Sequence, residues 1–225
     1  MGTRLISDGY EVYAPLFQRA EMNCLTAQLL AQPLLRSRAG ARHLLGCDSV
    51  AHLARDPRLV EIASRWLNAS AIPFKATLFD KSRRANWLVS WHQDTALPVS
   101  KRRDVAGWGP WSTKDGVTYA RAPGRALERV IALRVHLDDS TSNNGPLRVL
   151  PGSHIHGVLD DAQIHDLSQR TTPVQCTVPA GGVIAMRPLL VHASSKATTA
   201  AARRVLHLEY ATSLVPEPGL ELCAA

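Results

Sequence analysis

Two short motifs in this 225-residue chain place an aspartate two positions after a histidine: His92-Gln93-Asp94 and His136-Leu137-Asp138. On an extended strand, residues i and i+2 point to the same side, so either pair would present an imidazole and a carboxylate to one point. A histidine from a neighbouring strand would complete a two-histidine, one-carboxylate face, the ligand set of many non-haem Fe(II) sites. His154-Ile155-His156 is a third candidate, interpreted as a cupin-like histidine pair. Spacing alone leaves the choice among the three open.

The last third of the chain supplies a further histidine with a cation near it. The glycines 181–182 precede an apolar run that ends at His192, and a small polar stretch then leads to Arg203. This pattern predicts two strands joined by a turn, which would bring the imidazole close to the guanidinium. Such a pair suits a dicarboxylate cosubstrate, because one end can chelate the metal while the other pairs with the arginine. Ser194 could add a hydroxyl hydrogen bond to the same carboxylate.

The elements that position these residues differ between the two parts of the chain. Residues 1–70 are rich in helix formers, with one helix expected over 22–35 and another starting at Asp56-Pro57. From residue 71, short apolar runs separated by turn residues predict an antiparallel barrel or jelly roll, with the helices covering one outer face. We therefore expect a single domain over 1–225, mainly β, with a helical flank at 1–70 and a cupin-like double-stranded β-helix core at 71–212. The expected strands are 72–79, 87–92, 130–137, 147–150, 174–178, 183–186 and 205–210.

The segment 96–128 fits neither the helical pattern of residues 1–70 nor the strand-and-turn pattern of the rest of the chain. It contains several Gly and Pro residues together with Trp108, Trp111 and the cations at 101–103. Long segments without regular structure are uncommon in compact domains and often form lids or binding loops. We expect a long loop here, either a substrate lid whose aromatic and cationic residues suit an anionic substrate, or a surface loop anchored by two buried tryptophans.

Composition and charge exclude several classes of protein. The chain is 45% hydrophobic, which is too apolar for a disordered protein, and it has no apolar run long enough for a membrane span. The 26 Lys and Arg against 19 Asp and Glu give a net charge of +7, which favours an anionic partner without choosing one. The four cysteines have no CxxC spacing, and the N-terminus has no secretory signal. These features predict reduced thiols and a cytoplasmic location.

Five segments together resemble the phytanoyl-CoA dioxygenase family of Fe(II)/2-oxoglutarate-dependent oxygenases. The most specific is SNNGPLRVLPGSH, residues 142–154, because its run of Asn-Asn-Gly-Pro-Leu and Leu-Pro-Gly-Ser-His has no reason to recur by chance. In the family this motif lies between the His-x-Asp pair and the distal histidine. The other segments are DGY at 8–10, WHQD at 91–94, PLLVHASS at 188–195 and RRVLHLEYA at 203–211.

The resemblance assigns the metal ligands among the open candidates. The order of motifs selects His92 and Asp94 over the pair at 136–138, and it makes His192 the third iron ligand. It also identifies His154 with a histidine outside the metal triad, so the cupin-like pair at 154–156 is set aside.

The resemblance also implies a cosubstrate site. Arg203, eleven positions after the distal histidine, matches the arginine that binds 2-oxoglutarate, and Ser194 matches a serine that contacts it. One departure concerns Arg134, which stands where relatives have a tryptophan beside the cosubstrate. Its additional cation is expected to contact the cosubstrate or the substrate.

The activity implied by the resemblance is a dioxygenase reaction that uses Fe(II), 2-oxoglutarate and O2 and releases succinate and CO2. An intact Asp94 favours hydroxylation or another oxidation over halogenation.

Basic residues around the expected site favour an anionic small-molecule substrate, although solvated surface charge also explains them. No nucleic-acid motif and no membrane partner is expected, and the oligomeric state stays undetermined. The alternatives are an oxygenase acting on a protein or nucleic acid, and a non-catalytic jelly-roll binding protein. The basic residues are Lys81, Arg83, Arg84, Lys101–Arg103, Arg121 and Arg125.

Overall fold

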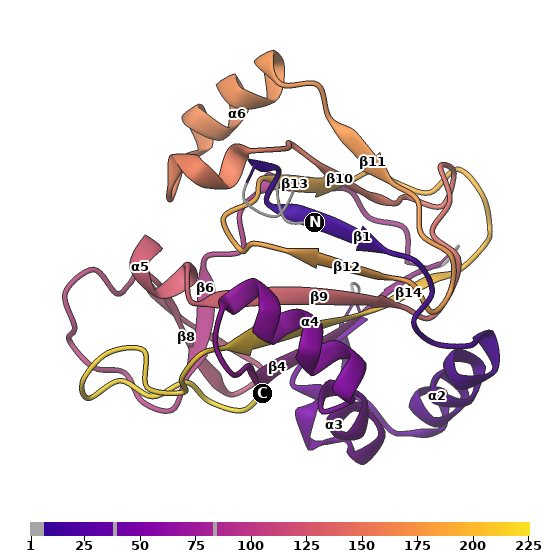
Figure 1. Ribbon diagram of the computed structural model, residues 1–225, viewed down its shortest axis with the longest axis horizontal. Coiled ribbons are helices and arrows are strands. Elements are labelled where there is room, and N and C mark those ends of the chain that lie inside the picture. The colour runs from indigo at the N-terminus through magenta and orange to yellow at the C-terminus, as the bar shows by residue number, and fades with distance from the viewer. Residues whose placement is uncertain (1–6, 38–39, 83–84) are drawn as a thin grey trace.

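The computed structural model describes residues 7–37, 40–82 and 85–225 (Figure 1). The expected basic residues Arg83 and Arg84 lie outside this part of the chain. Two antiparallel sheets form its centre. The larger sheet has, in spatial order, β1 (Tyr10–Tyr13), β12 (Val183–Met186), β9 (Val130–His136), β14 (Arg203–Ala211), β4 (Ile72–Lys81), β3 (Gly40–Ala41) and β2 (Arg36–Ser37).

The smaller sheet faces the larger one across an apolar layer. Inward-facing residues of both sheets, among them Ala132, Ile184, Leu147 and Val149, form one buried cluster there. The two sheets together confirm the predicted mainly β, double-stranded β-helix fold class. The strands of the smaller sheet are, in spatial order, β11 (Val174–Cys176), β10 (Leu147–Val149), β13 (His192–Ser194) and β5 (Val89–His92).

Three helices cover the outer face of the larger sheet, as the sequence predicted: α2 (Arg19–Ala31), α3 (Asp48–Ala54) and α4 (Pro57–Leu67). Helix α4 begins where expected, because Asp56 accepts a hydrogen bond from the Arg58 backbone N–H and proline occupies its first turn. The apolar side chains of α4 recur at helical spacing and pack on outward residues of β9 and β14, which fixes the sheet against the helical layer.

The N-terminal 70 residues are not only helical, which corrects the predicted flank. Strand β1 pairs with β12 at the edge of the larger sheet, and β2 and β3 extend its other edge. Strand β1 has only four residues and its pairing partner lies about 170 positions away, so no local pattern indicated it. Just before it, Gly9 has a φ of +78°, and a Cβ there would lie 2.3 Å from Nδ1 of His154. The DGY motif therefore has a packing role.

The segment 96–128, expected as a long loop, contains a third antiparallel sheet. Its strands are β6 (Ala96–Val99), β8 (Val117–Arg121) and β7 (Trp111–Lys114), followed by the short helix α5 (Gly124–Leu127). Strands β7 and β8 form a hairpin whose two-residue turn is Asp115-Gly116, with φ of +49° and +83°. An Asp-Gly turn is among the strongest hairpin signals, so the sequence held this information.

A further helix, α6 (Asp161–Arg170), stands between strands where none was expected. It buries only Ile164, so its apolar pattern is weak, but Asp160 and Gln163 form a capping box at its start. A short 3-10 turn, η2 (Ser153–His156), precedes it, and another, η1 (Leu44–Gly46), precedes α3.

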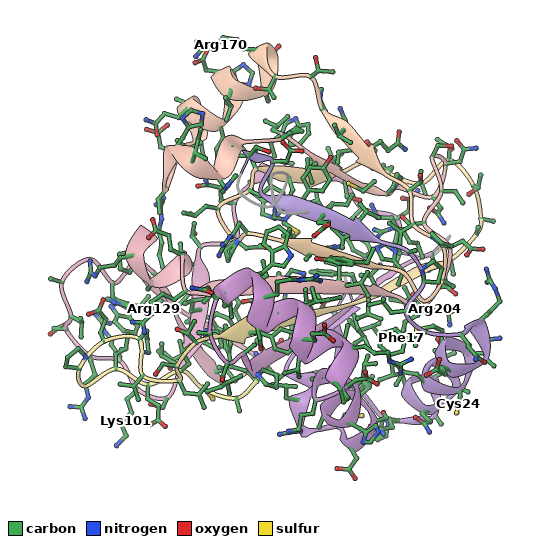
Figure 2. The ribbon with its side chains drawn as sticks, in the orientation of Figure 1. Phe17, Cys24, Lys101, Arg129, Arg170 and Arg204 are labelled. Carbon is green, nitrogen blue, oxygen red and sulfur yellow. The ribbon has the colours of Figure 1, made fainter. Side chains whose placement is uncertain are left out.

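Much of the net charge lies at the periphery. Lys101, Arg129 and Arg170 are all exposed, and Figure 2 shows Arg170 at the outer edge of the molecule. Among the described residues, no helix combines the length and apolar character needed to cross a membrane. The four cysteines are free thiols.

Candidate metal centre

His92, Asp94 and His192 come together where β5 ends and β13 begins. One potential ligand atom from each lies within 4.8 Å of the others. The carboxylate is central: its Oδ1 is 3.6 Å from Nε2 of His92 and its Oδ2 is 3.5 Å from Nε2 of His192. Two imidazole nitrogens and one carboxylate oxygen that converge from one side could hold a divalent metal and leave the opposite positions open. This donor set fits Fe(II).

Strand pairing produces this convergence. His92 ends β5 and His192 begins β13, and the two residues are direct partners in the antiparallel register. Their ring centroids are 4.1 Å apart. Asp94 follows two residues after His92, and its backbone N–H donates to the carbonyl of Pro188, which ties this segment to the approach of β13.

Hydrogen bonds to the backbone orient both imidazoles. Nδ1 of His92 lies 2.8 Å from the Ser90 carbonyl oxygen, and Nδ1 of His192 lies 2.9 Å from that of Leu190. A carbonyl can only accept, so each Nδ1 carries the proton and each Nε2 keeps a free lone pair for a metal. Burial lowers the pKa of His192 to about 3, which keeps this ring neutral. Burial opposes ionisation of Asp94, but this carboxyl titrates in acid, where His192 is charged, and the attraction to His192 and His92 holds its pKa below the usual range.

A third histidine, His207 on β14, lies beside the cluster but is not positioned as a ligand. Its Nδ1 is 3.1 Å from a guanidinium nitrogen of Arg134, which can only donate, so the ring proton sits on Nε2. That Nε2–H points to Glu209, with Oε1 at 3.1 Å, and is 3.8 Å from Oδ2 of Asp94. A protonated Nε2 has no lone pair for a metal.

The rival motifs are engaged elsewhere. Asp138 forms a two-pronged ion pair with Arg204, with both N···O distances at 2.7 Å, while His136 is buried in the barrel interior. His154 and His156 lie in η2, away from the ligand cluster. Within the described ranges, only the cluster of His92, Asp94 and His192 could hold a metal.

Cations gather on one side of the ligand cluster. Arg203 and Lys81 are direct partners on β14 and β4, both almost completely buried, and Arg134 is buried beside them. Arg203, Arg134 and Ser194 line one cavity together with the three ligand residues. Burial and the charge of Arg134 lower the pKa of Arg203 to about 9, and burial and the two arginines lower that of Lys81 to about 8. Two buried arginines on the cavity wall, with the buried Lys81 paired beside Arg203, are suited to a dianion.

The 142–154 motif positions this cationic group. Asn144 closes its turn by side-chain hydrogen bonds to the backbone of Thr141 and Asp139, and its own carbonyl accepts from Nε of Arg203 at 3.3 Å. The next carbonyl, of Gly145, accepts the Ser194 hydroxyl at 2.8 Å. Gly145 is required here, because a Cβ would lie 2.5 Å from a backbone oxygen.

Ser194 and Arg134 are both held by protein partners. Lys81 Nζ donates to Oγ of Ser194 at 2.8 Å, and the hydroxyl's single proton goes to Gly145. Arg134 contacts His207 and lies 5.2 Å from the Phe79 ring centroid, while its Nε has no hydrogen-bond partner among the described residues. An orphaned buried N–H that faces a cavity marks a place for an acceptor.

Lys81 and His207 were not identified as site residues from the sequence. Lys81 was only one of several basic residues around the expected site. The alternation of side chains along a strand would have predicted the position of His207. Residues 203, 205, 207 and 209 of β14 share one face, so a buried Arg203 places the other three inside the barrel.

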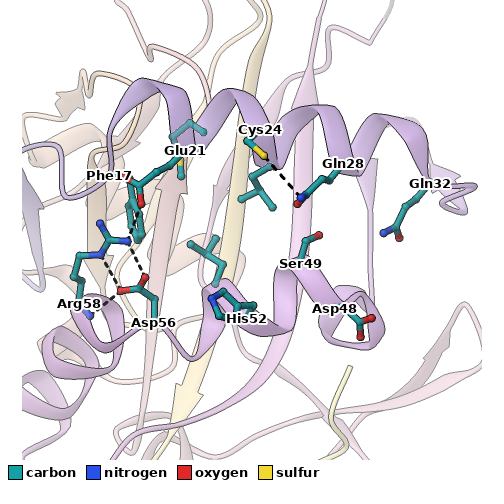
Figure 3. Close-up of a pocket in the computed structure, with 13 residues that line it drawn as sticks. Phe17, Glu21, Cys24, Gln28, Gln32, Asp48, Ser49, His52, Asp56 and Arg58 are labelled. Carbon is teal, nitrogen blue, oxygen red and sulfur yellow. Dashed lines mark hydrogen bonds and ion pairs between the residues drawn. The ribbon is translucent and has the colours of Figure 1, made fainter.

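A separate groove of about 800 Å³ lies between α2 and α3 (Figure 3). Figure 3 shows Arg58 bridging Asp56 and Glu21 at one end, and Gln28 near Cys24 farther along. None of its lining residues belongs to the ligand cluster. The groove therefore lies on the helical layer, outside the barrel that holds the candidate centre.

Comparison with known proteins agrees with the fold. The family model for phytanoyl-CoA dioxygenase matches residues 8–205. An L-proline trans-4-hydroxylase of Streptomyces griseoviridis is 29% identical over 204 residues, which cover 76% of this chain and 68% of that protein.

Solved structures extend the comparison. The crystal structure of EctD from S. alaskensis with 2-oxoglutarate and 5-hydroxyectoine matches with a TM-score of 0.71 and 25% identity, covering 93% of this chain and 74% of that one. The fold is also that of AviO1 from Streptomyces viridochromogenes Tue57, with a TM-score of 0.67, 22% identity and coverage of 93% and 92%. This chain belongs to the phytanoyl-CoA dioxygenase family of Fe(II)/2-oxoglutarate-dependent oxygenases.

Proposed function

We propose that the protein hydroxylates a small-molecule metabolite, with His92, Asp94 and His192 as the ligands of Fe(II). The main support for this proposal is that their three ligand atoms lie within 4.8 Å of one another, with both histidine Nδ1 atoms hydrogen-bonded to backbone carbonyls. When bound, Fe(II) and 2-oxoglutarate use O2 to insert one oxygen atom into a C–H bond and the other into succinate, with loss of CO2. An intact Asp94 fills the position that halide would need, which supports hydroxylation.

The cationic side of the cavity binds 2-oxoglutarate in this proposal. Arg203 pairs with the carboxylate farthest from the metal, because it is buried, lines the cavity and has only a backbone carbonyl as its hydrogen-bond acceptor among the described residues. Lys81 adds a second positive charge, and Arg134 offers its unpartnered Nε to the same cosubstrate. Ser194 acts through Lys81 and the Gly145 carbonyl, which it holds in place.

A small-molecule substrate is supported by the relatives. The curated relative is named for L-proline, and the EctD structure contains 5-hydroxyectoine. The intact ligand cluster and the buried Arg203 argue against a binding protein that has lost catalysis. The expected cytoplasmic location remains a prediction.

Succinate release tests the proposed function. The protein is loaded with Fe(II) anaerobically, mixed with 2-oxoglutarate and ascorbate, exposed to air, and assayed for succinate with a panel of small metabolites that includes L-proline and ectoine. We expect at least one compound to accelerate succinate release and to gain 16 mass units, the mass of one oxygen atom.

The matched control is His52→Ala, which changes an exposed histidine of α3 in the helical layer outside the barrel. It should behave as the unmodified protein, whereas His192→Ala should lose both succinate release and product. Turnover that survives His192→Ala unchanged would contradict the ligand assignment.

A further inference from the structure

The barrel interior holds a second group of ionised side chains at the other end of β14. Arg203 and Glu209 share the inner face of this strand and are six residues apart, about 20 Å at strand rise, with His207 between them. Glu209 is 3% exposed and accepts from Lys75 Nζ at 2.6 Å and from His207 at 3.1 Å. Because His207 also lies beside Asp94, this group borders the candidate metal centre on the side away from Arg203.

The β7–β8 hairpin brings another lysine to the same place. Tyr119 of β8 is 1% exposed, and two ammonium groups approach its ring, with Lys114 Nζ at 4.7 Å and Lys75 Nζ at 5.7 Å from the centroid. Ring faces attract cations, so Tyr119 holds both lysines near its ring. His43 fixes the ring by approaching its hydroxyl at 3.0 Å.

Two of the three cations near Tyr119 have an ion-pair partner and the third, Lys114, has none among the described residues. Glu209 pairs with Lys75, and Asp115 pairs with Arg42 at 3.2 Å. Lys114 has no carboxylate at ion-pair distance in the described part of the chain, although Lys75 and Arg42 are both close enough to repel it. Burial and these neighbouring cations lower the pKa of Lys114, whereas Glu209 keeps Lys75 charged against its burial. Lys114 is thus a half-buried cation with no ion-pair partner among the described residues, and such a group is suited to bind an anionic ligand.

We propose that Lys114 and Lys75 form a carboxylate-binding subsite that holds the organic substrate beside the metal centre. The substrate class is a small molecule with a carboxylate group, whose reacting carbon lies between this subsite and Asp94. The inference rests on the proposed function, because it names the substrate chemistry of the same site. It also gives a role to the hairpin of segment 96–128, which forms one wall of the substrate site. L-proline, for which the curated relative is named, carries such a carboxylate.

Lys114 is the residue to change. Removing Lys75 would leave Glu209 buried without its ion-pair partner, so the protein could fail to fold for reasons unrelated to binding. Lys114→Met removes a charge that has no carboxylate partner among the described residues and keeps most of the apolar stem. Lys114→Gln is a second variant that keeps a polar end, and Lys101→Met is the control, because Lys101 is an exposed lysine of the same segment.

The experiment measures ligand-induced thermal stabilisation without turnover. Each protein is loaded with Ni(II) and saturating 2-oxoglutarate, and its melting temperature is measured with acetate, benzoate or L-proline and with the matched amides acetamide, benzamide and L-prolinamide. We expect at least one carboxylate to raise the melting temperature above its amide in the unmodified protein and in Lys101→Met. In both Lys114 variants that difference should fall by at least half.

Two results would overturn the subsite: a carboxylate-dependent shift that persists in both Lys114 variants, or no carboxylate that exceeds its amide in the unmodified protein. The proposed function is checked separately by the visible absorption of the anaerobic Fe(II)–2-oxoglutarate complex in Lys114→Met. If Lys114→Met keeps that absorption but loses the carboxylate-dependent rise in melting temperature, the substitution affects substrate binding and leaves iron and 2-oxoglutarate binding intact.

Discussion

The two ends of the inner face of β14 are both charged, yet they are built differently. At the Arg203 end, Lys81, Arg134 and Arg203 have backbone carbonyls, a serine hydroxyl and a histidine as partners, and none is paired with a carboxylate among the described residues. At the Glu209 end, Lys75 is neutralised by Glu209, and only Lys114 lacks an acidic partner there. The first end is suited to a dianion and the second to a single carboxylate. In the proposed arrangement, the barrel separates cosubstrate from substrate by charge, with the proposed metal ligands between them.

The largest effect is expected from removing one of the proposed metal ligands, which lie between the two ends. His192→Ala deletes a buried ligand, and we expect the affinity for Fe(II) to fall by more than about 100-fold, beyond the effect of losing a residue that only supports a ligand. Iron content after anaerobic dialysis measures this. Retention of one equivalent of iron would show that the metal lies elsewhere.

The Arg203 end is tested by a pair of adjacent residues. Arg203→Met should weaken 2-oxoglutarate binding by about 100-fold, since losing a buried charge-assisted pair costs 2–5 kcal/mol and each 1.4 kcal/mol is a factor of ten. Arg204 points to the other face, where it pairs with Asp138, so Arg204→Met should leave this affinity within about twofold. Anaerobic calorimetric titration of the metal-loaded proteins compares them. Equal losses would mean that general charge, rather than position, attracts the cosubstrate.

The charge of Lys81 should make the affinity of the Arg203 end for 2-oxoglutarate depend on pH. The pKa of this buried lysine is lowered to about 8, so in the free protein it loses its proton as the pH rises through 8, while a bound dianion would favour the charged form. Affinity for 2-oxoglutarate should therefore be constant below pH 7 and fall by up to about tenfold per pH unit above 8. Lys81→Arg stays charged and should flatten this profile between pH 7 and 9. A profile that is identical in both proteins would remove Lys81 from the cosubstrate site.

The smallest effect is expected at Ser194. Its hydroxyl proton is already given to Gly145, and Lys81 keeps a second acceptor in the Ser195 carbonyl at 2.6 Å. Ser194→Ala should thus weaken 2-oxoglutarate binding less than about tenfold, in line with one neutral hydrogen bond of about 1 kcal/mol. A loss as large as that of Arg203→Met in the same titration would show that the hydroxyl turns and binds the cosubstrate directly.

The sequence predicted the Arg203 end far better than the Glu209 end, and the reason is physical. His92, Asp94, His192 and Arg203 lie at strand ends beside turn residues, and both the alternation of strands and the family motifs mark such positions. The 142–154 motif is specific because its turn uses its own side chains and carbonyls to hold Arg203 and Ser194.

The Glu209 end depends on pairings between distant segments. Lys75 and Glu209 are 134 positions apart and meet only because β4 and β14 pair in one register. Lys114 reaches them through a hairpin in a segment whose Gly, Pro and Trp content resembled a loop, and its Asp115-Gly116 turn was the one local clue. Strand β1 was missed for the same reason, since a short edge strand is defined by its partner.

Anaerobic absorption spectroscopy measures whether iron and 2-oxoglutarate bind together at the proposed site. We expect Fe(II)-loaded protein titrated with 2-oxoglutarate to develop the weak visible charge-transfer band of the metal chelate, saturating at one equivalent. Arg203→Met should require far more 2-oxoglutarate to reach the same band, and His192→Ala should not form it. A protein that binds one Fe(II) but shows no band at saturating 2-oxoglutarate, or a His192→Ala variant with an unchanged band, would contradict the account.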